Sequence, residues 1–252
     1  MDINLEQEQP MVENDKKMSL WSHIDELRMR LLYSVIALLF GIVISVIFAD
    51  FLLKLIAEPI GGMERLLSIQ VTENISVYFR VTMLSGLIIS LPFLFFQIYL
   101  FVTPGLTLTE RRWILLAIPT ATILFLAGTL FAYLVMLPTA LPFLVEFPGP
   151  DVLPKWKDYV NFVTSLIFWI GVSFEAPLLM YLLAKLGIVD AKGLAKQWRI
   201  AAVIIAVIAA VATPTPDPIN MGILMLPLFM LYGLGILLAL LAKREKNKKT
   251  SE

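Results

Sequence analysis

Long apolar runs separated by short charged segments dominate the sequence. Charged residues are absent from residues 31–49, 81–109, 113–145, 200–213 and 220–242, and residues 159–184 contain a single one, Glu175. A helix needs about 20 mostly apolar residues to cross the roughly 30 Å hydrocarbon core of a bilayer. The pattern therefore predicts an all-α polytopic membrane protein with six transmembrane helices.

The fifth apolar run is shorter than the others. Its roughly 14 residues reach only about 21 Å at about 1.5 Å per residue. A proline-rich turn over residues 213–218 follows it, and proline cannot continue a helix. We expect short fifth and sixth helices, with this turn inside the outer half of the membrane. For the same reason, the third helix should end near Pro138 and Pro142.

Two predicted outer loops are long. Residues 50–80 begin with apolar side chains at helical spacing, namely Phe51, Leu52, Leu55 and Ile56. This spacing predicts a short amphipathic helix on the membrane surface. Pro59, Gly61 and Gly62 should end that helix. The other loop, residues 138–158, is rich in proline and should form a rigid cap.

The basic residues indicate an orientation. Six spans place both termini on one side, and fifteen of the twenty lysines and arginines fall in the tails and loops of that side. By the positive-inside rule, both termini are cytoplasmic. We divide the chain into a polar cytoplasmic tail (residues 1–18), a six-helix transmembrane domain (19–242) and a charged cytoplasmic tail (243–252).

Composition excludes several classes of function. The chain is 59% hydrophobic and 16% charged, against about 25% charged in soluble domains, and its net charge of zero gives no field for nucleic acid. It has no cysteine, and its one histidine, His23, precedes the first span, which argues against thiolate sites and Ser–His catalysis in the bilayer. No phosphate-binding loop or zinc-protease motif is present. We expect no enzyme, no cofactor and no metal site.

Two acids stand beside the predicted cytoplasmic ends of helices. Glu26 opens the first span, and Glu110 follows a Pro104-Gly105 turn, with Thr109 suited to the helix start. Each acid can simply favour its helix dipole while nearby arginines anchor the span. Alternatively, two carboxylates on one aqueous side could receive two guanidinium groups in planar, charge-assisted pairs.

Glu175 is the one acid inside a span. An ionised carboxylate there is costly, so it should be protonated, paired or beside water, and a functional role competes with a purely structural bond to a neighbouring helix. Gln97, at a similar expected depth on the second span, is the natural hydrogen-bond partner. In the proline-rich turn, Pro216 and Asp217 suit ordinary turn chemistry and capping of the sixth helix, with a functional role as the alternative.

Five motifs in order give the sequence a resemblance to the TatC family, the core subunit of the twin-arginine protein translocase. They are residues 23–31, 101–112, 131–138, 174–177 and 213–217. Together with six spans and a short fifth helix, they cover nearly the whole chain after residue 18. The sequence departs from the family pattern at Met221 and Gly233, near the last two helices.

The resemblance implies a fold and a function. It implies a concave, glove-like face in the cytoplasmic (inner) membrane and a receptor for folded proteins with Arg-Arg signal peptides. Glu26 and Glu110 would bind the arginine pair, with Arg28, Phe101 and Pro104 in the same site. Glu175 would contact single-span partners, which are TatA-type subunits and, where a second type exists, TatB-type subunits. A homo-oligomer within the complex and export driven by the proton-motive force are also implied.

Two other hypotheses stay open from the residues alone. A proton-coupled small-solute transporter could use Glu175 as its proton site, although no internal repeat supports it. A purely structural scaffold would tolerate neutralisation of both Glu26 and Glu110.

Overall fold

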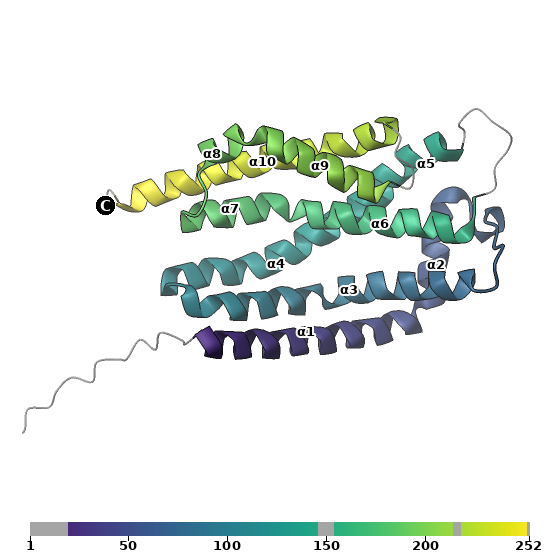
Figure 1. The fold of residues 1–252 in the computed structure, drawn as a ribbon, viewed down its shortest axis with the longest axis horizontal. Helices are drawn as coiled ribbons and strands as arrows, with labels where there is room; N and C mark the ends of the chain where they lie inside the picture. The colour runs from purple at the N-terminus through teal and green to yellow at the C-terminus, as the bar shows by residue number, and fades with distance from the viewer. Residues whose placement is uncertain (1–19, 146–153, 214–217, 251–252) are drawn as a thin grey trace, which may run out of the picture.

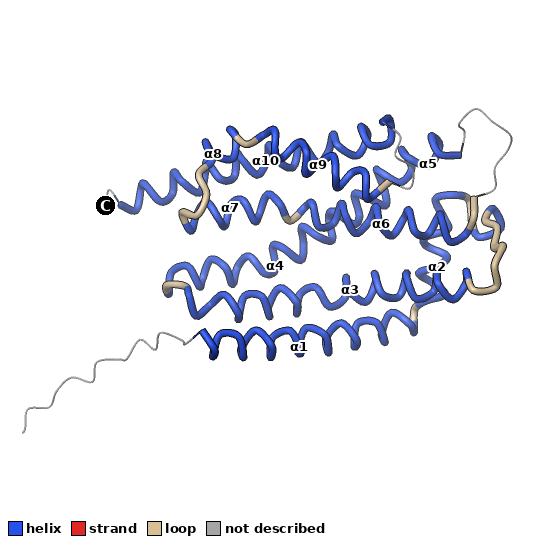
Figure 2. The backbone as a smooth tube through the Cα atoms, in the orientation of Figure 1, coloured by secondary structure: helices blue, strands red, loops and turns tan. Residues whose placement is uncertain are grey.

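Helices form nearly all of the structure. The computed structural model describes residues 20–145, 154–213 and 218–250. Its elements are α1 (Leu20–Ile47), α2 (Ala49–Ala57), α3 (Glu73–Val102), α4 (Leu108–Phe131), α5 (Leu137–Val145), α6 (Trp156–Phe174), α7 (Ala176–Leu186), α8 (Ala191–Lys196), α9 (Trp198–Ala212) and α10 (Pro218–Thr250). Within these ranges the only strand-like pairing is an isolated bridge between Leu67 and Lys155. The all-helical prediction is confirmed (Figure 2).

Six apolar helical stretches match the predicted spans. Five are long enough to cross a membrane: Trp21–Ile47, Glu73–Gly105, Glu110–Pro142, Trp156–Leu186 and Met221–Ala242. The other, α9, has only 15 residues, so the prediction of a short fifth helix is confirmed. The prediction of a short sixth helix is wrong, because α10 runs for 33 residues. Its apolar part ends at Ala242, and the charged segment that follows continues as helix.

The long helices run side by side along the longest axis of the molecule (Figure 1). We call the end where α1 begins and α10 finishes the terminal end. The other end, where α2 lies and α3 and α6 begin, is the cap end. The α9 helix and the start of α10 stop short of the level that α3 and α6 reach at the cap end (Figure 1).

Close helix crossings depend on glycine. A Cβ on Gly41 would clash with the carbonyl oxygen of Gly86, and one on Gly86 would lie 2.7 Å from the backbone nitrogen of Ile42. Only glycine therefore allows α1 and α3 to approach this closely, as in other membrane helix pairs. The α4–α6 crossing uses a reciprocal arrangement, in which Phe125 covers Gly171 and Phe174 covers Gly128.

Two tyrosines hold α2 across the cap end. The hydroxyl of Tyr133 donates to the carbonyl of Leu55 at 2.8 Å, and that of Tyr159 donates to the carbonyl of Ile56 at 2.7 Å. The predicted amphipathic helix is thus present as α2. It gives way to a turn in which Gly61 and Gly62 adopt φ values of 95° and 104°, in the region that favours glycine.

The third span passes Pro138, and its apolar stretch ends at Pro142, the second of the two prolines near which the sequence predicts an end. The helix passes through a π-helical turn, Ala132–Met136, and continues as α5 to Val145. A proline lacks an N–H and clashes with the carbonyl four residues earlier. The wider π turn shortly before Pro138 changes that register, so the chain stays helical past the first of the two prolines. Residues 146–153 of the predicted rigid cap, residues 138–158, lie outside the described residues. Where the structure resumes, the carbonyl of Pro154 accepts a hydrogen bond from the Leu67 N–H at 3.1 Å.

Candidate functional site

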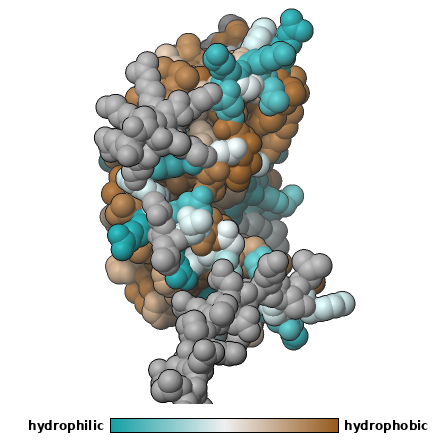
Figure 3. All heavy atoms as spheres, turned by 90° about the vertical axis from the view of Figure 1, so that its left-hand side faces the viewer, coloured by the Kyte–Doolittle hydropathy of each residue, from teal (hydrophilic) through white to brown (hydrophobic). Residues whose placement is uncertain are grey.

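The predicted functional residues fall into two groups. Glu26, Phe101, Pro104 and Glu110 lie on elements that meet at the terminal end, where α1 starts and the α3–α4 turn lies (Figure 1). Seen from this end, hydrophilic side chains gather on the surface while the flanks are mostly hydrophobic (Figure 3). Gln97 and Glu175 lie deeper, within the helical bundle.

Glu26 is held in place but retains bonding capacity. Its side chain is only 16% exposed. Oε1 accepts a hydrogen bond from Arg30 Nη2 at 3.2 Å, one helical turn further on, which is the spacing that favours such pairs. Oε2 is buried and has no hydrogen-bond partner among the described residues. A buried carboxylate oxygen without a donor is unfavourable by about 1–3 kcal/mol, so an incoming donor would stabilise it.

His23 connects Glu26 to α3. Its Nδ1 lies 4.0 Å from Glu26 Oε2, and its ring stacks on Phe101 with 4.4 Å between centroids and 15° between planes. Phe101 therefore lies next to the acid, as the sequence predicts. The bridging role of His23 was missed, and the only signal for it was its position one turn before Glu26.

Arg28 does not join this group. It is exposed, and with Asp25 it lines an open groove on α1. Two residues correspond to about 200° around a helix, so Arg28 and Glu26 point to nearly opposite sides. The partner of Glu26 is instead Arg30.

Glu110 forms a capping box at the start of α4. Its Oε2 accepts from the Thr107 backbone N–H at 2.9 Å and from the Thr107 hydroxyl at 2.7 Å, while its own N–H donates to Thr107 Oγ1 at 3.4 Å. The cap is Thr107, so the prediction of Thr109 is wrong by two residues. The reason is that α4 already begins at Leu108, so the residue before it serves as the cap. Pro104 is exposed in the preceding turn, Thr103–Gly105. The cap holds the carboxylate of Glu110 in a defined position.

Glu175 lies where the fourth span breaks. The α6 helix ends at Phe174 and α7 begins at Ala176, with Pro177 in its first turn (Figure 2). Proline provides no N–H for the preceding turn, which interrupts the ladder at this point. Glu175 Oε1 is buried and lacks a hydrogen-bond partner among the described residues.

Gln97 does not pair with Glu175. Gln97 is 5% exposed, and its Oε1 is likewise buried without a partner in the described part of the chain. The expectation of a common depth is wrong. Gln97 is about 8 Å from the end of α3, whereas Glu175 is about 17 Å from the end of α7. The α7 helix continues further toward the terminal end after Glu175 than α3 does after Gln97.

The structure does not describe every predicted site residue. Pro216 and Asp217 lie outside the described residues. Within the described ranges, no group of three or more histidine or acidic side chains could hold a metal ion.

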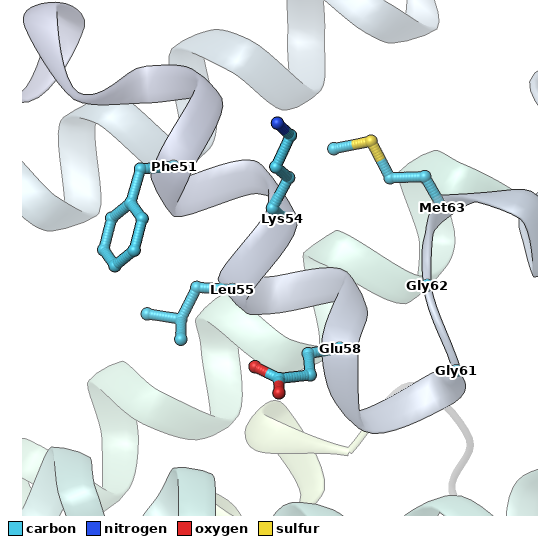
Figure 4. A pocket seen from close by; sticks show the side chains of 7 residues that line it. All are labelled: Phe51, Lys54, Leu55, Glu58, Gly61, Gly62 and Met63. Carbon is cyan, nitrogen blue, oxygen red and sulfur yellow. The ribbon is translucent and has the colours of Figure 1, made fainter.

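A separate recess of about 520 Å³ lies at the cap end, between α2 and the turn that follows it. Figure 4 shows Lys54 and Glu58 on one face of α2 with their charged groups pointing in different directions. The apolar lining comes from Phe51, Leu55 and Met63. This recess contains none of the residues of the terminal-end group.

Comparisons with known proteins agree with the resemblance. The family model for the Sec-independent protein translocase protein TatC matches residues 22–227. The TatC protein of Deinococcus radiodurans is 38% identical over 229 residues, which span 87% of this chain and 85% of the relative. That of Carboxydothermus hydrogenoformans is 34% identical, over 89% of this chain and 94% of the relative.

A solved structure supports the same assignment. The crystal structure of the twin arginine translocase receptor TatC superimposes with a TM-score of 0.79 at 31% identity, covering 88% of this chain and 99% of that chain. The prediction of a protein-transport component rather than an enzyme is confirmed by these matches. The chain belongs to the TatC family of Sec-independent protein translocase proteins.

Proposed function

We propose that this chain binds the Arg-Arg pair of signal peptides on folded proteins at its terminal end, through Glu26 and Glu110. The observation that carries the proposal is the buried Glu26 Oε2, which has no donor among the described residues. A guanidinium group presents planar N–H donors that match a carboxylate. The solved TatC relative is described as a twin arginine translocase receptor, which agrees with this role.

The neighbours of the two acids support a prepared site. Arg30 occupies Oε1 of Glu26, so the carboxylate stays oriented before a peptide arrives. The His23–Phe101 stack forms an aromatic wall beside it. The Thr107 cap holds the second carboxylate at the start of α4. Such preorganisation reduces the entropy lost when a ligand binds.

The terminal end faces the cytoplasm in this proposal. Fifteen of the twenty lysines and arginines belong to its loops and tails, and the positive-inside rule then places it inside the cytoplasmic membrane. Arg-Arg signal peptides would arrive from that side.

Glu175 serves a later step in this proposal. Its buried oxygen and the helix break beside it make a polar position in an otherwise apolar span. Polar side chains at such depth stabilise contacts between membrane helices. Glu175, together with Gln97 nearer the terminal end, would contact single-span TatA-type or TatB-type subunits during export driven by the proton-motive force.

Peptide binding to the detergent-purified protein tests the receptor role. A labelled signal peptide with Arg-Arg should bind better than its Lys-Lys counterpart, because lysine keeps the charge but loses the planar fork. Glu26→Gln or Glu110→Gln should each cost about 2–5 kcal/mol of binding free energy, in line with truncated buried charge pairs. Asp25→Asn is the matched control, since Asp25 is an exposed acid on the same helix. Equal affinity of both peptides, or an equal loss in the Asp25→Asn control, would overturn the proposal.

A further inference from the structure

Arg80 is a charged residue within a membrane-spanning helix, far from the terminal-end group. It lies in the second turn of α3, near the cap end, and its side chain is exposed on the surface. A charged side chain in a span is costly unless it is paired or reaches the interface. Its position therefore requires an explanation.

The guanidinium of Arg80 is fixed by neutral groups of α6. Its Nε donates to Thr164 Oγ1 at 2.7 Å, and its Nη2 donates to Ser165 Oγ at 2.9 Å and to the Asn161 carbonyl at 3.4 Å. Among the described residues, no carboxylate forms an ion pair with it. These bonds orient the group but leave its positive charge uncompensated and its Nη1 donors without a partner in the described chain.

Arg80 lies at the depth of the lipid headgroups. The helical stretch Glu73–Gly105 has 33 residues, or about 50 Å at about 1.5 Å per residue. Centred on a roughly 30 Å hydrocarbon core, it extends about 10 Å beyond the core on each side. Arg80 is about 10 Å from the start of the helix, which places the guanidinium at the boundary between hydrocarbon and headgroups.

We propose that Arg80 and the polar face of α6 form a binding site for the phosphate of a phospholipid headgroup, in the leaflet at the cap end. The two N–H groups of Nη1, which have no acceptor in the described chain, supply charge-assisted hydrogen bonds to phosphate oxygens. Lys157 is exposed one turn before Asn161 on α6 and adds positive charge on this side, while the exposed Asp158 lies toward the other edge of the same face. The bound phosphate compensates the charge that no acid of the described chain compensates.

Lipid retention by the purified protein tests this site. Native mass spectrometry should detect bound phosphatidylglycerol, and Arg80→Gln should reduce its retention about five-fold, as expected for one basic residue at a membrane surface. Arg80→Lys should give an intermediate loss, because lysine keeps the charge but loses the Nη1 donors and the bonds to α6 that orient them. Arg65→Gln, an exposed arginine after α2 at the same end, is the control and should retain the lipid. Equal retention by Arg80→Gln and Arg65→Gln would overturn the proposal.

A second measurement separates lipid from free phosphate and does not depend on a variant. Phosphatidylglycerol should raise the melting temperature of the unmodified protein more than diacylglycerol, which has the same acyl chains without phosphate. Inorganic phosphate should not displace the lipid. Equal stabilisation by the two lipids contradicts the site, and displacement by inorganic phosphate contradicts its assignment to a lipid.

Discussion

The imidazole of His23 stacks on the ring of Phe101, 4.4 Å away and nearly parallel to it. This contact joins the first turn of α1 to the last turn of α3 and lies beside the buried oxygen of Glu26. Because the stack fixes the relative position of two helices at the proposed site, its loss should change peptide binding more than overall stability.

We expect Phe101→Ala to lower the affinity for an Arg-Arg signal peptide by about three- to ten-fold, because an aromatic pair contributes about 0.5–1.5 kcal/mol beyond its buried area. Fluorescence anisotropy of a labelled peptide measures the change. Phe96→Ala is the control, since Phe96 is on the same helix and partly exposed. An unchanged affinity in Phe101→Ala would remove this residue from the site.

Glu175→Leu should raise the thermal stability of the detergent-purified protein and reduce export. The leucine removes a buried oxygen that has no partner in the described chain, and such an oxygen costs about 1–3 kcal/mol. Thermal unfolding and export of a folded reporter protein are the two measurements, and signal-peptide binding should stay normal. Val172→Leu, an exposed position on α6, controls for added apolar surface. Normal export by Glu175→Leu would leave Glu175 with a structural role only.

Gly86→Ala should destabilise the protein by about 1–3 kcal/mol, the usual cost of overpacking. Its Cβ would lie 2.7 Å from the Ile42 backbone nitrogen, and backbone cannot move aside as a side chain can. Gly222→Ala on α10 is the matched control, since a Cβ there meets nothing within 4 Å, and alanine favours helix over glycine by about 1 kcal/mol. The melting temperature should therefore fall in Gly86→Ala and rise in Gly222→Ala. A shift in the same direction would mean that α1 and α3 can separate without cost.

Tyr159→Phe should loosen α2. The Ile56 carbonyl loses its donor, at an expected cost of about 1–3 kcal/mol for a buried group. Hydrogen exchange should become faster in residues of α2 and stay unchanged in α10. Tyr78→Phe is the control, because the Tyr78 hydroxyl makes no hydrogen bond with the described residues. Unchanged exchange in α2 would show that packing alone holds this helix.

Hydropathy alone predicted the six apolar helices, because charged residues mark both ends of each long apolar run. The α2 helix was also predictable, since helical spacing of its apolar side chains is a local signal. The errors concern features that depend on neighbours or on fine backbone geometry. Proline signals a helix end, but the π turn of residues 132–136 lets the third span continue past Pro138.

The candidate site was only partly predictable. Glu26 and Glu110 stand out as acids at helix starts, and the four-residue spacing of Glu26 and Arg30 is a local signal for their ion pair. Contacts between distant segments carry no local signal, as with His23 and Phe101 or with Arg80 and α6. The common depth expected for Gln97 and Glu175 failed because it required the lengths of two different helices.

The attachment of α2 has a consequence for substitutions in this helix. Both tyrosine hydroxyls bind backbone carbonyls, at Leu55 and Ile56, rather than side chains. Every amino acid supplies the same carbonyl, so substitutions at these two positions leave the acceptors in place. The exposed side chains of α2, such as Phe51, therefore take no part in this attachment, whereas Ile56 and Ala57 are constrained by the core in which they are buried.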